Sequence, residues 1–239
     1  MIAAFALVLA QTPKNVPADA ELVYPLMPRL TAVANEDGEK VRTHMTLHSM
    51  TVKLGKDFSS FESLSLFKNT AKVEGEVDLV VAFEAYRSGF GQNIPVIALW
   101  SDDEVLPVDL KTRYALPEKG QIGLYEFTYR VTVKRLATHS LRLKFSLPVG
   151  KSGIDREERL IGYRVMDIDQ RQALEQFRMS VKYDGEIVFV PIEAKPDWGW
   201  EVGANGAYLK LDRKKSDRDA ILTYRYYPAG FGERTKVRP

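Results

Sequence analysis

Three histidines are the imidazoles that this chain offers for catalysis or metal binding. His44 and His48 lie four positions apart in a segment with the alternation of a β-strand, where even spacing puts both side chains on one face. Positions i and i+4 of a strand are about 13 Å apart, beyond the reach of one zinc ion with ligand bonds of about 2 Å. His139 lies in a turn between two expected strands. We therefore predict no metal site and no histidine-based catalysis.

Serine and glycine motifs for nucleophilic or phosphate chemistry are incomplete. A Ser-His-Asp hydrolase places its serine in a G-x-S-x-G turn, and Gly150-Lys-Ser-Gly153 is the nearest segment here. It lacks the upstream glycine of a phosphate-binding P-loop, and no credible helix follows it. Gly89-Phe-Gly91 and Gly230-Phe-Gly232 also precede no helix and complete no dinucleotide-binding pattern. We predict turns or loops at these positions and no bound cofactor.

Six loop carboxylates leave one enzymatic alternative open. Two carboxylates about 5 to 10 Å apart can hydrolyse a glycosidic bond, so a hydrolase is one interpretation. Charged loop residues are mostly solvated, and we assign no residue a catalytic role. The six residues are Asp102, Asp103, Glu104, Asp155, Glu157 and Glu158.

Trp198 and Trp200 are the residues that we assign to ligand binding. Side chains at i and i+2 of a strand face the same way, so the two indoles would form a platform for a sugar ring or for a partner's proline. The alternative is that both rings fill or cover the core, since tryptophan is highly buried on average. A carbohydrate-binding module that uses both residues is therefore an alternative function.

The composition excludes several classes of function. The chain has 34 Lys and Arg against 32 Asp and Glu, a formal net charge of +2, which gives no strong field to attract nucleic acid. Cysteine is absent, which excludes disulfides, cysteine-ligated zinc, iron–sulfur clusters and thiol nucleophiles. The expected partner is a protein or a polysaccharide of the cell envelope, not nucleic acid.

The first ten residues, MIAAFALVLA, predict export. This apolar run, residues 1–10, has Val8 and Ala10 at the −3 and −1 positions of a signal-peptide cleavage site, although no Lys or Arg precedes it. Ten residues span about 15 Å as a helix, so we expect no membrane insertion after the leader is removed. Residues 11–28 contain four prolines and are interpreted as a linker. The expected location is secreted or periplasmic.

The elements that must position these residues are β-strands, because apolar and polar residues alternate with a period of two through most of the chain after residue 28. The clearest example is 124–136, and segments 141–149 and 77–83 repeat its alternation of apolar and polar residues. Asp184-Gly185 and Asn205-Gly206 predict tight hairpins. Many short strands separated by such turns predict an all-β fold, an antiparallel β-sandwich.

The chain is predicted to hold two β units, 29–104 and 105–239, each immunoglobulin-like or jelly-roll-like. Residues 78–91 align without gaps to residues 219–232, which indicates either a duplication or a chance match of two amphipathic strands. The charged segment 101–104 is the predicted boundary. One short helix at most is expected, at 169–177, from an aspartate at its N-cap and apolar residues at helical spacing.

Three segments carry a resemblance to known proteins: Met50-Thr-Val-Lys-Leu54, Leu64-Ser-Leu-Phe-Lys-Asn-Thr70 and the valine strand 77–83. With the Tyr-rich strand 222–227, they resemble uncharacterised secreted bacterial two-part β-sandwich proteins of unknown function, over about half of the chain. In those relatives the valine strand ends in a Pro-containing turn, whereas this chain has Ala85-Tyr-Arg-Ser-Gly89. The resemblance implies a secreted two-part β-sandwich and no activity.

These features together predict a protein that binds a partner and does not catalyse a reaction. We expect a non-catalytic exported β-sandwich protein that acts as a cell-envelope or extracellular interaction module. The alternatives are the carbohydrate-binding module with Trp198 and Trp200, and the hydrolase with loop carboxylates.

Overall fold

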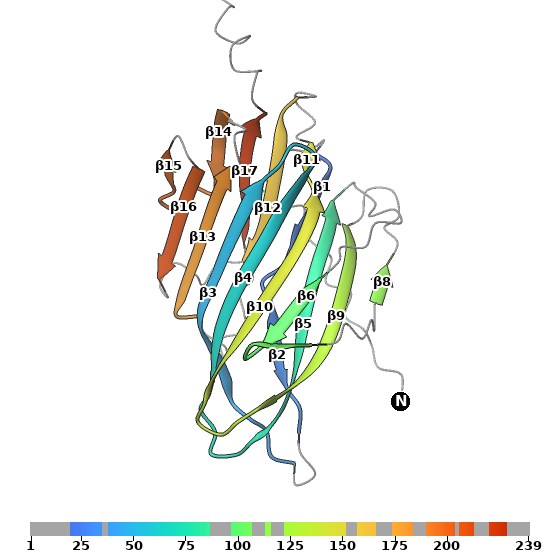
Figure 1. Cartoon of the computed structure of the whole chain (residues 1–239), viewed down its shortest axis with the longest axis vertical. Coiled ribbons are helices and arrows are strands. Elements are labelled where there is room, and N and C mark those ends of the chain that lie inside the picture. The colour runs from blue at the N-terminus through green and yellow to red at the C-terminus, as the bar shows by residue number, and fades with distance from the viewer. Residues whose placement is uncertain are drawn as a thin grey trace, which may run out of the picture.

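The computed structural model describes residues 20–34, 38–86, 97–106, 113–115, 122–151, 157–165, 174–183, 190–203, 206–212 and 220–228. Every regular element in these residues is a β-strand, and the strands form two facing layers, so the predicted all-β sandwich is confirmed. The longest strands of one layer, β3 (Thr43–Leu54), β4 (Phe58–Asn69) and β10 (Thr138–Pro148), run along the length of the molecule (Figure 1). Within the described ranges no helix is long and apolar enough to cross a membrane.

One layer is an eight-stranded sheet with the order β15-β16-β13-β3-β4-β10-β6-β7. Its strands pair antiparallel, except that β13 runs parallel to β3. Side chains alternate between core and solvent along its long strands, as the sequence period predicts. Its other members are β6 (Ala98–Ser101), β7 (Glu104–Val105), β13 (Gln176–Tyr183), β15 (Glu201–Gly203) and β16 (Gly206–Asp212).

Two smaller sheets form the other layer, which we call the composite layer. Strand β1 and the residues that flank it join them. Strand β1 pairs with β5, while Glu21 exchanges backbone hydrogen bonds with Lys151 of β11 and the Met27 N–H donates to the Arg164 oxygen of β12. The five-stranded sheet contains β1 (Leu22–Pro25), β2 (Arg29–Ala32), β5 (Gly75–Tyr86), β8 (Arg113–Ala115) and β9 (Ile122–Val133). The four-stranded sheet contains β11 (Gly150–Lys151), β12 (Arg159–Val165), β14 (Val190–Lys195) and β17 (Ala220–Tyr227).

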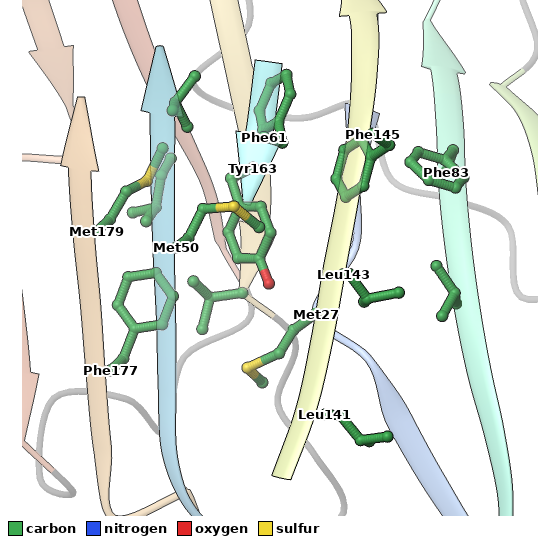
Figure 2. Close-up of a cluster of buried hydrophobic side chains, with 14 of the residues drawn as sticks. Met27, Met50, Phe61, Phe83, Leu141, Leu143, Phe145, Tyr163, Phe177 and Met179 are labelled. Carbon is green, nitrogen blue, oxygen red and sulfur yellow. The ribbon is translucent and has the colours of Figure 1, made fainter. Parts of the chain in front are cut away.

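The core between the two layers is rich in aromatic rings. Phe145 stacks on Phe61 with ring centroids 5.2 Å apart, and it meets Phe83 of the composite layer edge-on at 5.0 Å. Tyr163 of β12 stacks on Phe177 of β13 at 5.9 Å. Figure 2 shows these rings packed with methionine and leucine side chains between the strands. Both sheets of the composite layer therefore pack on the same eight-stranded sheet, and apolar burial stabilises the chain without any disulfide.

The segment interpreted as a linker contains a buried strand. Leu22, Val23 and Tyr24 of β1 are at most 3% exposed, although they lie within 11–28. The prolines fit because Pro25 is the last residue of β1 and Pro28 precedes β2, so neither removes an N–H from the middle of a strand. The linker prediction is therefore wrong for residues 20–28, and residues 1–19 lie outside the described ranges.

The predicted boundary near residue 104 does not divide the sheets. Strand β5 pairs with β9, β4 with β10 and β3 with β13, so strands from 29–104 and from 105–239 share both layers. Asp102 and Asp103 form the tight turn between β6 and β7, with φ of 46° and 69°. Aspartate tolerates this left-handed conformation better than most residues. The charge run therefore marks a hairpin.

The predicted helix 169–177 ends inside a strand. Gln176 and Phe177 begin β13, where Phe177 enters the core, because the alternation that continues to Tyr183 fits a strand better than a helix. Residues 166–173, which hold the start of the predicted helix, lie outside the described ranges.

The two Gly-containing hairpin signals have different outcomes. A hairpin is present near Asn205-Gly206, since β15 pairs with β16. Gly206 is the first residue of β16 and the partner of Gly203, with a φ of 141°, so it is not one of the two central turn residues as predicted, and Asn205 lies outside the described ranges. A Cβ at Gly206 would lie 2.0 Å from the Val181 carbonyl oxygen, so glycine is required there. Asp184-Gly185 lies outside the described ranges, but the strands on either side of it, β13 and β14, lie in different layers and are not hairpin partners.

Candidate functional site

Trp198 and Trp200 lie where the chain crosses from one layer to the other. Strand β14 is the last strand of the four-stranded sheet, and β15 is the first strand of the eight-stranded sheet. Residues 196–200 connect them, so this segment closes one open edge of the sandwich. The segment is not a strand, and Gly199 has a φ of +88°, so the predicted strand platform of two parallel indoles is wrong.

Two hydrogen bonds to one carbonyl fix the shape of this segment. The Trp198 backbone N–H donates to the Pro196 oxygen at 2.8 Å, and the Trp200 indole Nε1–H donates to the same oxygen at 3.1 Å. Both rings are partly buried and pack against the main core. Each indole therefore presents one side to the core and keeps another side accessible at the edge.

Exposed apolar residues flank the two indoles. Ile192 of β14 is 39% exposed and Val202 of β15 is 51% exposed. In the described part of the chain, β14 and β15 each pair with a strand on one side alone, so both have unpaired backbone groups facing outward. We call Ile192, Trp198, Trp200 and Val202 the tryptophan edge. The sequence pattern pointed to the indoles by residue type but missed Ile192 and Val202, because single exposed aliphatic residues carry no signal of their own.

Charged residues of β14 and β17 lie beside the tryptophan edge. Lys195 contacts Glu193 at 2.6 Å, and Arg225 contacts the other Glu193 oxygen at 2.9 Å. The hydrogen bond from Lys195, opposed by partial burial and assisted by Arg225, holds the pKa of Glu193 below its usual value. Glu193, Lys195 and Arg225 are thus paired with each other, whereas Asp197 and Glu201, the neighbours of the two indoles, are exposed and have no ion pair among the described residues. The edge therefore offers apolar contact beside two exposed carboxylates.

The two strand histidines face opposite sides of the sheet, contrary to the prediction of one face. A β-bulge between Met45 and Leu47 adds one residue to β3 and reverses its alternation. His44 remains partly exposed and contacts Glu175 at 2.9 Å, whereas His48 is fully buried in the core. The two imidazoles therefore point away from each other on opposite faces of the sheet.

His48 is an internal structural residue. Its Nδ1 lies 2.7 Å from the Ser65 hydroxyl and its Nε2 lies 2.6 Å from the Tyr163 hydroxyl. The imidazole ring also packs against the rings of Tyr163 and Phe177, with centroids 5.7 and 5.9 Å away. Burial lowers the pKa of His48 to about 3, so the imidazole is neutral at physiological pH. Both nitrogens are engaged within the core, which leaves none for a substrate.

His139 forms a structural pair with Asp102 at the β6–β7 hairpin. Its Nδ1 donates to Asp102 at 2.6 Å, and its Nε2 accepts the Lys134 backbone N–H at 3.0 Å. Ser140 donates its backbone N–H to the same aspartate at 2.7 Å. Partial burial raises the pKa of Asp102, but these hydrogen bonds outweigh it and the pKa lies below its usual value. Serine, histidine and aspartate meet here, yet no imidazole nitrogen is available to activate a nucleophile.

The loop carboxylates that the structure describes lie in different surroundings. Asp102 belongs to the hairpin, Asp103 contacts Arg142 at 3.4 Å, and Glu104 is exposed in β7. Glu158 is 2% exposed and contacts the Arg225 guanidinium, so the expectation of a solvated loop acid is wrong for it. Asp155 lies outside the described ranges.

One hollow of about 550 Å³ opens beside the start of β3. None of its lining residues is a carboxylate, so it does not offer the acid pair of a glycosidase. In the part of the chain that the structure describes, no group of three or more His, Asp or Glu residues is arranged to hold a metal ion. The hollow is lined by Ala32, Lys40, Val41, Arg42, Thr43, His44 and Thr70.

The glycine motifs add no phosphate site to the described ranges. Gly150 and Lys151 form β11, whose partner strand is β12, and so belong to the sheet. Ser152 and the two Gly-Phe-Gly segments lie outside the described ranges.

Comparisons with known proteins inform the fold. No protein-family model matches the chain, and no curated protein matches its sequence. The structure is similar to a crystal structure of a protein from Legionella pneumophila whose proposed role is nutrient binding, with a TM-score of 0.57 over 86% of this chain and 72% of that chain. At 12% sequence identity, this likeness shows a common fold alone.

Proposed function

We propose that this chain is an exported, non-catalytic β-sandwich protein that binds a protein partner of the cell envelope through its tryptophan edge. The observation that carries the proposal is the placement of two half-buried indoles between two edge strands. Unpaired edge strands can take up an extended peptide as an additional strand, and neighbouring aromatic rings then contact its side chains.

The contacts of the histidines and of Glu158 support a non-catalytic role. Among the described residues, His48 and His139 have both ring nitrogens engaged by protein groups, and His44 contacts Glu175. The most buried of the six candidate acids, Glu158, contacts an arginine. A general acid or base needs a free position toward a substrate, and these groups are held by their neighbours.

The structural neighbour is compatible with this role. The proposed role of the Legionella protein is nutrient binding, which is a function of binding and not of chemical conversion. The likeness supports a binding function in general terms, and the tryptophan edge supplies the specific surface.

The test is an array experiment with two tryptophan variants. The purified chain is applied to an array of extended peptides and to a glycan array of envelope polysaccharides. We expect peptide binding that Trp200→Ala abolishes, together with a stability loss of about 1–2 kcal/mol, smaller than for a fully buried indole. The matched control is Trp100→Ala, which removes a partly buried indole near the opposite edge of the same sheet. Equal losses of binding in both variants, or no binding of wild type to either array, would contradict the proposal.

A carbohydrate-binding module is the second candidate, and the fixed orientation of Trp200 favours it. Its Nε1–H is held by Pro196, so the ring is presented without a conformational search, as sugar stacking requires. Glycan binding that is lost in Trp200→Ala, without peptide binding, would select this candidate over the first.

Export is a separate part of the proposal and rests on residues 1–10. If these residues are a signal peptide, the mature chain begins at Gln11, after Val8 and Ala10. Mass spectrometry of the protein recovered from the periplasm or medium of an expressing bacterium tests this. Intact residues 1–10 on protein that stays in the cytoplasm would overturn it.

A further inference from the structure

Four cations lie together on the solvent face of the eight-stranded sheet. Lys53 is in β3, Arg178 and Lys182 are in β13, and Lys210 is in β16, and all four are exposed. We call these residues the basic cluster. They are far apart in sequence, and the order β16-β13-β3 brings them onto three adjacent strands.

The register sets these cations directly opposite each other in pairs. Arg178 pairs with Lys210, and Lys182 pairs with Lys53. Adjacent strands are about 4.8 Å apart, and like charges directly opposite each other on a sheet are destabilising. No ion pair neutralises any of the four within the described residues, while Arg178 donates a hydrogen bond to Gln176 at 2.7 Å. The chain thus keeps two unfavourable cationic pairs on one face, as expected of a surface that binds an anion.

Hydroxyl groups fill the space between the two cationic pairs. Ser180 pairs with Thr51 on one side and with Tyr208 on the other, in the row midway between Arg178 and Lys182. Arg178 and Lys182 are separated by about 13 Å along β13, with the hydroxyl row between them. The surface therefore alternates cations, hydroxyls and cations, with one partly exposed tyrosine ring among the hydroxyls.

Two glutamates border the basic cluster. Glu62 is opposite Thr51 but contacts Lys144 at 3.3 Å. Glu201 of the edge strand β15 is opposite Tyr208. Both lie outside the two cationic pairs, so they limit the cationic surface at its sides without neutralising its centre.

We infer that the basic cluster binds an acidic polysaccharide along the solvent face of the eight-stranded sheet. Lysine and arginine would meet its carboxylate or sulfate groups, the hydroxyl row would hydrogen-bond its sugar hydroxyls, and Tyr208 would contact a ring. Phe58 of β4, 57% exposed, lies on this face two residues from Ser60, the partner of Lys53. One large apolar side chain at the margin of the cluster is far less than the apolar face of a membrane-inserting element. One tyrosine is also too few for the successive base stacking of single-stranded nucleic acid.

Affinity chromatography on heparin-agarose, followed by titration with polygalacturonate, tests the inference. The double variant Lys53→Ser/Lys182→Ser removes one cationic pair. We expect it to elute at lower salt than wild type, with the slope of log affinity against log salt shallower by about 2, following the counterion-release rule for polyanions. The control Lys134→Ser/Arg135→Ser removes two exposed cations from the β9–β10 turn and leaves retention unchanged.

The result that overturns the inference is an equal effect of both double variants, since that would reflect net charge alone. Failure of wild type to bind either polysaccharide also overturns it. So does tighter binding to anionic lipid vesicles or to single-stranded DNA than to heparin. Tyr208→Ala adds a second measurement, because sugar contact predicts weaker binding with an unchanged salt slope, whereas a purely electrostatic surface predicts no change.

This surface is independent of the tryptophan edge. Binding through the basic cluster weakens as salt rises, whereas apolar contact at Trp198 and Trp200 persists at high salt. Trp200→Ala should leave heparin retention unchanged, and Lys53→Ser/Lys182→Ser should leave array binding in high salt unchanged. The failure of one proposal therefore does not decide the other.

Discussion

On the outer face of the composite layer, four strand arginines each contact a carboxylate, whereas the basic cluster on the outer face of the eight-stranded sheet has no acidic partner in the described ranges. Several of the paired groups are also partly buried, such as Arg225 at 18% and Glu158 at 3% side-chain exposure. The arginines of the composite layer thus stabilise the fold through their partners, whereas the four cations of the basic cluster lack such partners in the part of the chain that the structure describes. The pairs are Arg29–Glu126, Arg130–Asp78, Arg164–Glu84 and Arg225–Glu158.

The position of the pairs explains their structural role. Arg164 of β12 reaches Glu84 of β5, so this pair connects the two sheets of the composite layer beside β1. Tyr24 of β1 donates to the other Glu84 oxygen at 2.6 Å. The hydrogen bond that Arg225 donates to Glu158, with a further contribution from the one it donates to Glu193, raises the pKa of Arg225. Desolvated pairs of this kind depend on both partners, because removal of one leaves the other charge buried.

The largest expected effect follows from breaking one pair on the composite layer. Glu158→Gln leaves Arg225 with Glu193 as its described carboxylate partner, and we expect a loss of about 3 kcal/mol in the free energy of unfolding. Urea denaturation measures this. The control is Glu62→Gln on the opposite face, where Lys144 and Glu62 are each about half exposed and the expected loss is at most about 0.5 kcal/mol. Similar losses in the two variants would remove the distinction between the faces.

Much of the fold could be predicted because side-chain alternation is a local property. Strands β5, β9 and β10 were predicted from a period of two within single segments. Their pairing was not, because β13 beside β3 and β5 beside β9 join segments that are distant in sequence. The bulge at Met45–Leu47 also escaped prediction, since one extra residue reverses a face without changing the composition.

The tryptophan edge and the basic cluster also differ in how far the sequence could predict them. Trp198 and Trp200 were found from residue type, but their geometry was predicted wrongly because Gly199 takes a positive φ and ends the strand pattern. The basic cluster was missed for another reason. Its residues lie between positions 53 and 210, and a net charge of +2 hides any local excess. The strand order is required before these residues become neighbours.

The second expected effect concerns the core that both faces share. Burial holds the pKa of His48 at about 3, while an unfolded histidine has a pKa of about 6.5. Between these values the unfolded state binds more protons, so stability is complete above pH 6.5 and falls as the pH decreases. We expect His48 to account for a loss of about 2 kcal/mol between pH 7 and pH 5.

Chemical denaturation at a series of pH values, with wild type and His48→Gln, isolates this effect. The glutamine variant should be less stable overall, but the fall between pH 6.5 and 5 should be shallower. An unchanged slope in His48→Gln would place the proton uptake in the paired carboxylates of the faces and not in the core.

The smallest expected effect has the opposite sign and bears on the basic cluster. Lys210→Glu replaces a cation opposite Arg178 by an anion, so an unfavourable cross-strand pair becomes a favourable one. We expect the free energy of unfolding to rise by about 0.5 kcal/mol at low salt and the gain to disappear in 1 M salt, where charges are screened within about 3 Å. The same substitution should weaken heparin retention. If the variant is more stable but binds heparin less, this face keeps its cations for a ligand at the expense of stability. If the variant is less stable, Lys210 has a structural role like that of the arginines of the composite layer.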